Sequence, residues 1–123
     1  MPAPALRVLL GALAAVAIVA GALALRTDDR CASAKDALVS ARGAGMVAAA
    51  TRVADRCGDP RDRARADLQL IANDHRADAV ALARRMVRDN PDDYIGWVAV
   101  YRLTGSRAAF ERARELNPRG VQR

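Results

Sequence analysis

The sequence VLLGALAAVAIVAGALAL, from Val8 to Leu25, contains eighteen consecutive uncharged residues between Arg7 and Arg26. As a helix that rises about 1.5 Å per residue, this run spans roughly 27 Å, which is close to the hydrocarbon thickness of a bilayer. We therefore predict that residues 1–26 form a single transmembrane anchor and that the rest of the chain is tethered to a membrane. A buried core helix of a soluble protein is an alternative for such a run.

The same run also has features of a secretory signal peptide. Ala22-Leu23-Ala24 has the small-x-small form of a cleavage site, and Arg7 precedes the apolar stretch. The run is longer than the usual apolar region of about 7–15 residues, and no polar segment precedes the site. These features favour the anchor over a secreted protein whose signal peptide is removed.

The charges that flank the run predict its orientation. Arg7 lies before the run, whereas the segment from Arg26 to Arg30 contains two basic and two acidic residues. Basic residues near a span stay preferentially on the cytoplasmic side. We expect a cytoplasmic N-terminus and an extracytoplasmic C-terminal domain.

The only two cysteines of the chain support this placement. Cys31 and Cys57 lie symmetrically about Gly43-Ala44-Gly45. If these three residues form the turn between antiparallel helices, the cysteines meet at the open end, so we predict a disulfide-stapled helical hairpin in residues 27–58. Such a bridge suits an oxidising compartment. Two unrelated buried thiols are the alternative, and a metal site is not expected because His75 is distant in the sequence.

The composition after the run predicts an all-α fold, with three antiparallel helical hairpins following the transmembrane helix. Ala, Leu, Val and Arg dominate and favour helix. The six expected helices run from Asp28 or Asp29 to Arg42, from Met46 to Cys57, from Pro60 to Ala72, between His75 and Asp89, from Asp92 to Leu103, and from Ser106 to Leu116. Asp59 is the expected N-cap of the third helix, with Pro60 at its first position and Ala64, Leu68, Ile71 and Ala72 as its apolar stripe. Residues 59–118 contain the last two hairpins, and residues 119–123 form a tail.

Two segments near the C-terminus, Arg84–Pro91 and Arg112–Pro118, are similar to each other. The residues that recur are Phe110, Ala113 and Pro118 in the last unit, Ala79 and Pro91 in the preceding unit, and Trp97 at the opening of a first helix. In this pattern residues 59–118 resemble the tetratricopeptide repeat (TPR) family. The prolines at 60, 91 and 118 are 31 and 27 residues apart, shorter than the 34-residue period, and Met86 replaces a small residue. A generic helical bundle is the alternative.

The resemblance implies a non-catalytic scaffold whose first helices line a concave groove for a peptide or helix. With the register taken from Trp97, the groove-facing positions are Ile95, Val98, Ala99 and Arg102, together with Arg61, Arg65 and Leu68. The predicted partner-binding residues are therefore Arg61, Arg65 and Arg102, which suit an acidic peptide. The alternative is that each arginine lies on a solvated helix face and pairs with nearby acids.

Other classes of function have less support in the sequence. The chain has one histidine and no glycine-rich phosphate loop, so we predict no catalytic residue, cofactor or metal. The net charge of +6 raises the alternative of a basic helical domain that binds nucleic acid or an anionic membrane surface, but acids are interleaved with the basic clusters. We expect a membrane-tethered scaffold or adaptor in the cell envelope that binds a protein or peptide partner. Self-association would complete the surface of so short an array.

Overall fold

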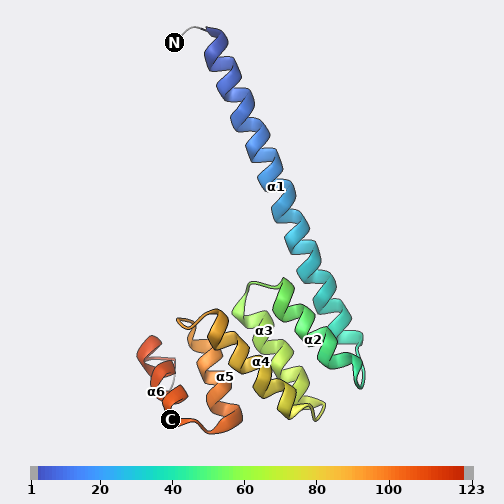
Figure 1. Cartoon of the computed structure of the whole chain (residues 1–123), viewed down its shortest axis with the longest axis vertical. Helices are drawn as coiled ribbons and strands as arrows, with labels where there is room; N and C mark the ends of the chain where they lie inside the picture. Colours follow the sequence, from blue (N-terminus) through green and yellow to red (C-terminus); the bar gives the residue numbers. More distant parts are fainter. Residues whose placement is uncertain (1–2, 121–123) are drawn as a thin grey trace.

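The computed structural model describes residues 3–120 and is all-helical within that range (Figure 1). Its helices are α1 (Ala3–Ser40), α2 (Gly45–Arg56), α3 (Pro60–Ala72), α4 (Arg76–Asp89), α5 (Tyr94–Thr104) and α6 (Arg107–Leu116). The predicted all-α class is confirmed for these residues. The first two residues of the predicted anchor and residues 121–123 of the predicted tail lie outside the described residues.

α1 is one uninterrupted helix that joins the apolar run to the body of the molecule. Its N-terminal part projects away from the other helices (Figure 1), and the large apolar side chains of the run are exposed. The length and composition of this helix meet the requirements of a membrane span, and equally those of a signal sequence. Its C-terminal part, by contrast, buries Ala34 and Leu38 in the core.

The predicted start of a separate helix at Asp28 or Asp29 is wrong, because both residues lie inside α1. An N-cap residue needs non-helical backbone angles so that its side chain can accept from the free N–H groups of the first turn. The segment between Leu25 and Cys31 contains neither Gly nor Pro, so nothing in it interrupts the helical hydrogen bonds.

A short turn and the predicted disulfide join α1 to α2. Gly43 has a φ of +54°, which glycine adopts without a steric penalty, and α2 begins at Gly45. Cys31 and Cys57 are bonded, with a Cα–Cα distance of 4.9 Å. Cys57 is buried in the same core cluster as Val53. The bridge therefore fixes the place at which α1 enters the body of the molecule.

Side-chain caps begin three of the later helices. Asp59 accepts a hydrogen bond from the backbone N–H of Arg61 at 2.8 Å, and Pro60 occupies the first turn, as predicted. Asp93 caps α5 and Ser106 caps α6. Each cap satisfies a backbone donor that the helix itself leaves free.

Each helix packs against the next one in the chain, and α3 also packs against α5. The core contains many alanines, which allow the helices to approach closely. Gly96 has the same effect between α4 and α5, because a Cβ atom at that position would lie 3.1 Å from Val87 Cγ1. This close packing fixes the positions of α1 and α3, the two helices that carry most of the candidate site.

The apolar stripe predicted for α3 is wrong in part. Ala66, Asp67 and Leu70 are the buried residues of this helix, whereas Leu68 is 60% exposed. Ile71, another member of the predicted stripe, does pack against the core. Because α3 has apolar residues on more than one side, periodicity alone did not identify the buried face.

Candidate binding cleft beside α1

A cleft of about 460 Å³ lies between the C-terminal part of α1 and α3, and we call it the distal cleft. Its lining residues are Lys35, Leu38 and Val39 from α1, Val53 from α2, and Asp62, Arg65, Leu68, Gln69 and Ala72 from α3. The volume lies in the range of ligand-binding sites in proteins. At one end of the cleft, the disulfide joins Cys31 of α1 to Cys57, three residues before the start of α3.

The distal cleft combines a buried apolar floor with two exposed apolar side chains. Leu38 and Val53 are buried. Val39 is 71% exposed and Leu68 is 60% exposed. Among the described residues that follow the apolar run, the only other exposed large apolar side chain is Tyr101. Exposed apolar residues gathered at one concave place mark a binding surface, whereas scattered ones do not.

The charged groups of the distal cleft leave one arginine without an acidic partner. Lys35 Nζ lies 3.5 Å from Asp62 Oδ1, so these two charges compensate each other. Arg65 is exposed, and no ion pair within residues 3–120 includes it. A guanidinium beside apolar surface can bind a carboxylate through two parallel hydrogen bonds.

A second cleft, of about 330 Å³, lies along α1 closer to the apolar run, and we call it the proximal cleft. Its lining residues are Thr27, Asp28, Cys31, Ala32 and Lys35 from α1, and Arg56, Gly58, Asp59 and Asp62 from the end of α2 to the start of α3. Lys35 and Asp62 line both clefts, so their ion pair lies where the two clefts meet.

The structure places the three predicted partner-binding arginines at different sites. Arg65 lines the distal cleft, whereas Arg61 and Arg102 do not. Arg61 is exposed in the first turn of α3, and Arg102 is exposed in the last turn of α5. No ion pair of the described part of the chain includes either of them. That all three bind a partner remains a prediction.

Sequence reasoning missed the contribution of α1 to this site. Lys35 and Val39 line the distal cleft, yet no residue of α1 was among the predicted groove positions. The TPR resemblance covers residues 59–118 and assigns no groove register before them. One sign was present in the sequence: Val39 directly follows the buried Leu38, so it cannot lie on the same face of the helix.

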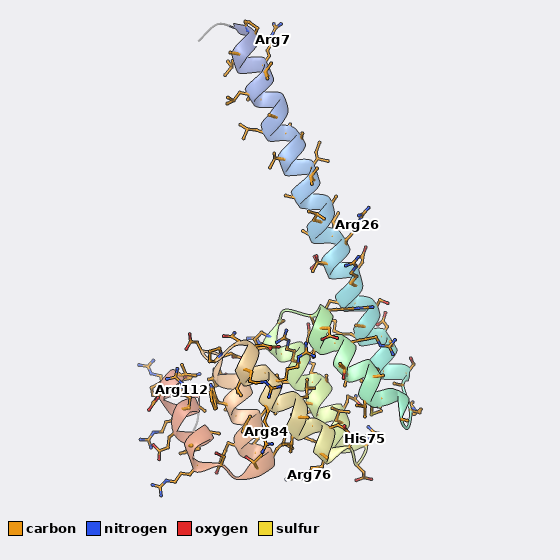
Figure 2. The ribbon with its side chains drawn as sticks, viewed as in Figure 1. Arg7, Arg26, His75, Arg76, Arg84 and Arg112 are labelled. Atoms are coloured by element: carbon orange, nitrogen blue, oxygen red, sulfur yellow. A yellow bond between two sulfur atoms is a disulfide. The ribbon has the colours of Figure 1, made fainter. Side chains whose placement is uncertain are left out.

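Two other sets of side chains have groups that can act chemically. His75 lies outside both clefts, and the sulfurs of Cys31 and Cys57 form the disulfide. His75 is at the turn before α4, with Nδ1 3.7 Å from Asp78 Oδ2, at the end of the domain opposite the apolar helix (Figure 2). The Sγ atoms of Cys31 and Cys57 and a carboxylate oxygen of Asp62 lie within 4.8 Å of one another. The two sulfurs are joined to each other and so provide no thiolate for a metal.

Asp67 is a buried carboxyl group in α3. Its side chain is 3% exposed, and Oδ1 has no hydrogen-bond partner within the described residues. Burial raises the pKa of Asp67 to about 7, because the charged form loses its hydration. Its protonation therefore changes near neutral pH.

Several arginines of the body are paired with acids from other helices or from the turns between them. Arg63 lies 3.5 Å from Asp89. Arg112 of α6, labelled in Figure 2, lies 3.2 Å from Asp92 in the turn before α5. Such pairs reduce the positive field that nucleic-acid binding requires. Binding of nucleic acid or of an anionic membrane surface stays an alternative prediction.

The chain matches no protein-family model, and comparisons with curated proteins and with solved structures give no match either.

Proposed function

We propose that this protein is a membrane-tethered, non-catalytic scaffold that binds a peptide segment of a partner protein in the distal cleft. In this proposal, apolar side chains of the partner cover Val39 and Leu68, and an acidic side chain binds Arg65. The domain lies outside the cytoplasm and acts as an adaptor in the cell envelope. Its helices form a TPR-like array of hairpins.

The observation that carries the proposal is the gathering of exposed apolar residues at the distal cleft. Val39 and Leu68 come from different helices, yet both line the same concave surface above the buried Leu38. Leaving two large apolar side chains in water has an unfavourable free energy of about 25 cal/mol per Å² of apolar area. A partner that covers them removes this cost. Arg65, which belongs to no ion pair of residues 3–120, supplies a polar contact that orients the partner.

Two features support the array and the tether. Consecutive helices pack against each other, and the contact between α3 and α5 is the one expected between first helices of neighbouring hairpins. α1 contains both the apolar run and one wall of the cleft without a break. A bilayer would therefore hold the cleft at a fixed distance from its surface. The disulfide fits an extracytoplasmic location.

The proposal can be tested by photocrosslinking from the cleft. A photoreactive amino acid replaces Leu68 in the full chain, within membranes of cells that produce the protein. A second variant of the protein carries the photoreactive amino acid in place of Arg84, an exposed residue of α4 (Figure 2). Arg84 belongs to no ion pair of the described residues. We expect a protein adduct from position 68 and none from position 84. Failure of position 68 to give an adduct would contradict a binding role for the cleft.

Charge-reversal variants then identify which arginine binds the partner. In the chain that carries the photoreactive group at position 68, Arg65→Glu should reduce the adduct at least tenfold, because it places a carboxylate against that of the partner. Arg84→Glu is the matched control and should leave the yield unchanged. The pair Arg61→Glu and Arg102→Glu should have a smaller effect than Arg65→Glu, since neither residue lines the cleft. An equal loss from this pair would show that the partner also contacts Arg61 or Arg102, outside the distal cleft.

A further inference from the structure

The proximal and distal clefts follow one another along α1. The proximal cleft begins at Thr27, the distal cleft extends to Val39, and the Lys35–Asp62 ion pair lines both. α3 accompanies α1 in the same direction, because Asp59 and Asp62 lie beside the proximal part and Leu68 and Ala72 beside the distal part. The two clefts together offer one elongated surface that starts near the apolar run.

The position of this surface can be measured from the end of the run at Leu25. At about 1.5 Å per residue along an α-helix, Thr27 lies roughly 3 Å beyond that point and Val39 roughly 21 Å beyond it. The headgroup layer on each side of a bilayer is about 5–7 Å thick. With the run in the hydrocarbon, only the start of the proximal cleft, at Thr27 and Asp28, lies within the headgroup layer. The rest of the proximal cleft, up to Lys35 at roughly 15 Å beyond Leu25, lies above the layer, as does the distal cleft.

The charges along the surface change sign with distance from the run. In the proximal cleft Asp28, Asp59 and Arg56 all lack an ion-pair partner among the described residues, which leaves an excess of one negative charge. In the distal cleft Arg65 leaves an excess of one positive charge, and the exposed Val39 and Leu68 line the same cleft. A complementary segment places one basic residue opposite Asp28 and Asp59, an acidic residue at the level of Arg65, and apolar residues beside Val39 and Leu68.

From this geometry we propose that the occupant is a juxtamembrane segment of a different membrane-anchored protein, lying alongside α1. The inference rests on the proposed function and names its class of partner. A segment that emerges from the bilayer already passes through the headgroup layer, whereas a soluble partner would have to displace headgroups to reach Thr27 and Asp28. A second copy of this chain fits less well, because Ala34 and Leu38 of its own juxtamembrane segment are already buried in its core.

The test compares photocrosslinks from the two ends of the surface. The photoreactive amino acid replaces Thr27 in one full chain and Val39 in another, in the same native membranes, with position 84 as the control. The two positions are 12 residues apart, so roughly 18 Å separates them along α1. We expect both to give adducts on one partner, at sites five to twelve residues apart, according to whether the segment is extended or helical. The site that reacts with position 27 should be the nearer one to a transmembrane segment of the partner.

Different outcomes separate this inference from the proposed function. The inference would be overturned if position 39 gave protein adducts while position 27 gave only lipid adducts. The distal cleft would then remain a binding site. A partner without a transmembrane segment, an adduct to a second copy, or the reverse order of crosslinked sites would also overturn it. The absence of protein adducts from both position 39 and position 68 would overturn the proposed function as well. As a further check, Asp28→Lys together with Asp59→Asn, which removes the charge of Asp59 but keeps a capping side chain, should reduce the adduct from position 27 about tenfold. Asp74→Asn, beyond the opposite end of α3, should not reduce it.

Discussion

The two parts of α1 share one continuous helix but have opposite environments. From Val8 to Leu25 the large apolar side chains are mostly exposed, whereas from Cys31 to Ser40 the helix buries Ala34 and Leu38 and is bonded through Cys31 to Cys57, the residue after α2. The backbone is the same in both parts, so side chains alone determine what each part can bind. The first part needs a nonaqueous environment for its apolar surface, and the second part provides a wall for a protein core. A single helix can therefore link a membrane to a binding cleft without a flexible joint.

The largest effect on the folded part should come from removing the disulfide. Replacing Cys31 and Cys57 together by serine should lower the free energy of unfolding of the domain by about 3–4 kcal/mol, because the bridge restricts a loop of 26 residues in the unfolded chain. Urea unfolding in detergent micelles measures this change. Reduced wild-type protein is the control and should match the variant. A loss below 1 kcal/mol would show that packing alone holds α1 to α2.

A pair of identical substitutions compares the two parts of α1 directly. Leu38→Ala should lower the unfolding free energy by about 2–3 kcal/mol, since it removes a buried side chain and leaves a cavity. Leu13→Ala, in the exposed run, should leave the unfolding of the domain unchanged and weaken membrane partitioning instead. Urea unfolding and binding to lipid vesicles provide the two measurements. Equal losses of stability from both variants would contradict the division of α1.

Asp67 is the reverse of the exposed apolar run. The run exposes apolar side chains, whereas Asp67 is an ionisable side chain buried in the core. Its pKa is raised from 3.8 to about 7, so the unfolded chain releases the proton first as the pH rises. The contribution of this group to stability is therefore complete below pH 4 and is lost as the pH rises to about 7. Asp67→Asn should raise the unfolding free energy at pH 8 by about 1–2 kcal/mol and have little effect at pH 4. Thermal unfolding at the two pH values tests this, and a gain of the same size at pH 4 would indicate a cause other than titration.

The smallest effect on stability should come from the surface of the distal cleft. Leu68→Ser should change the unfolding free energy by no more than about 0.5 kcal/mol, because the side chain is mostly exposed. The same variant should reduce the photocrosslink from position 39 at least fivefold. Tyr101→Ser, an exposed apolar residue outside the cleft, is the control for binding. If Leu68→Ser destabilised the domain as much as Leu38→Ala, Leu68 would be a core residue.

Much of the local structure was predictable because it depends on residues close together in the sequence. The symmetry of Cys31 and Cys57 about a glycine-containing turn predicted the bridge, and Asp59 with Pro60 predicted the start of α3. These features need only helical geometry and capping chemistry. The continuity of α1 was not predicted, because Asp28 and Asp29 are as suitable for a cap as for the interior of an already formed helix.

The candidate site was less predictable because it depends on how separate helices pack. Arg65 and Leu68 were among the predicted groove positions, and both line the distal cleft. Their neighbours on α1 could not be assigned, since the repeat pattern does not extend to residues 27–58. The burial of Asp67 also escaped prediction, because a carboxylate is normally expected at the surface and only the packing of α3 places this one inside.

The central claim is that one helix is both the membrane span and the wall of the binding cleft. It is tested most directly by a spin-label accessibility scan from Val8 to Val39 in lipid vesicles that contain the full chain. We predict that labels from Val8 to Leu25 are accessible to oxygen and inaccessible to a water-soluble nickel chelate. Beyond Arg26, accessibility should follow a helical period, with position 38 protected and position 39 exposed. Nickel accessibility throughout the apolar run, or a mature protein that begins after Ala24, would contradict the claim.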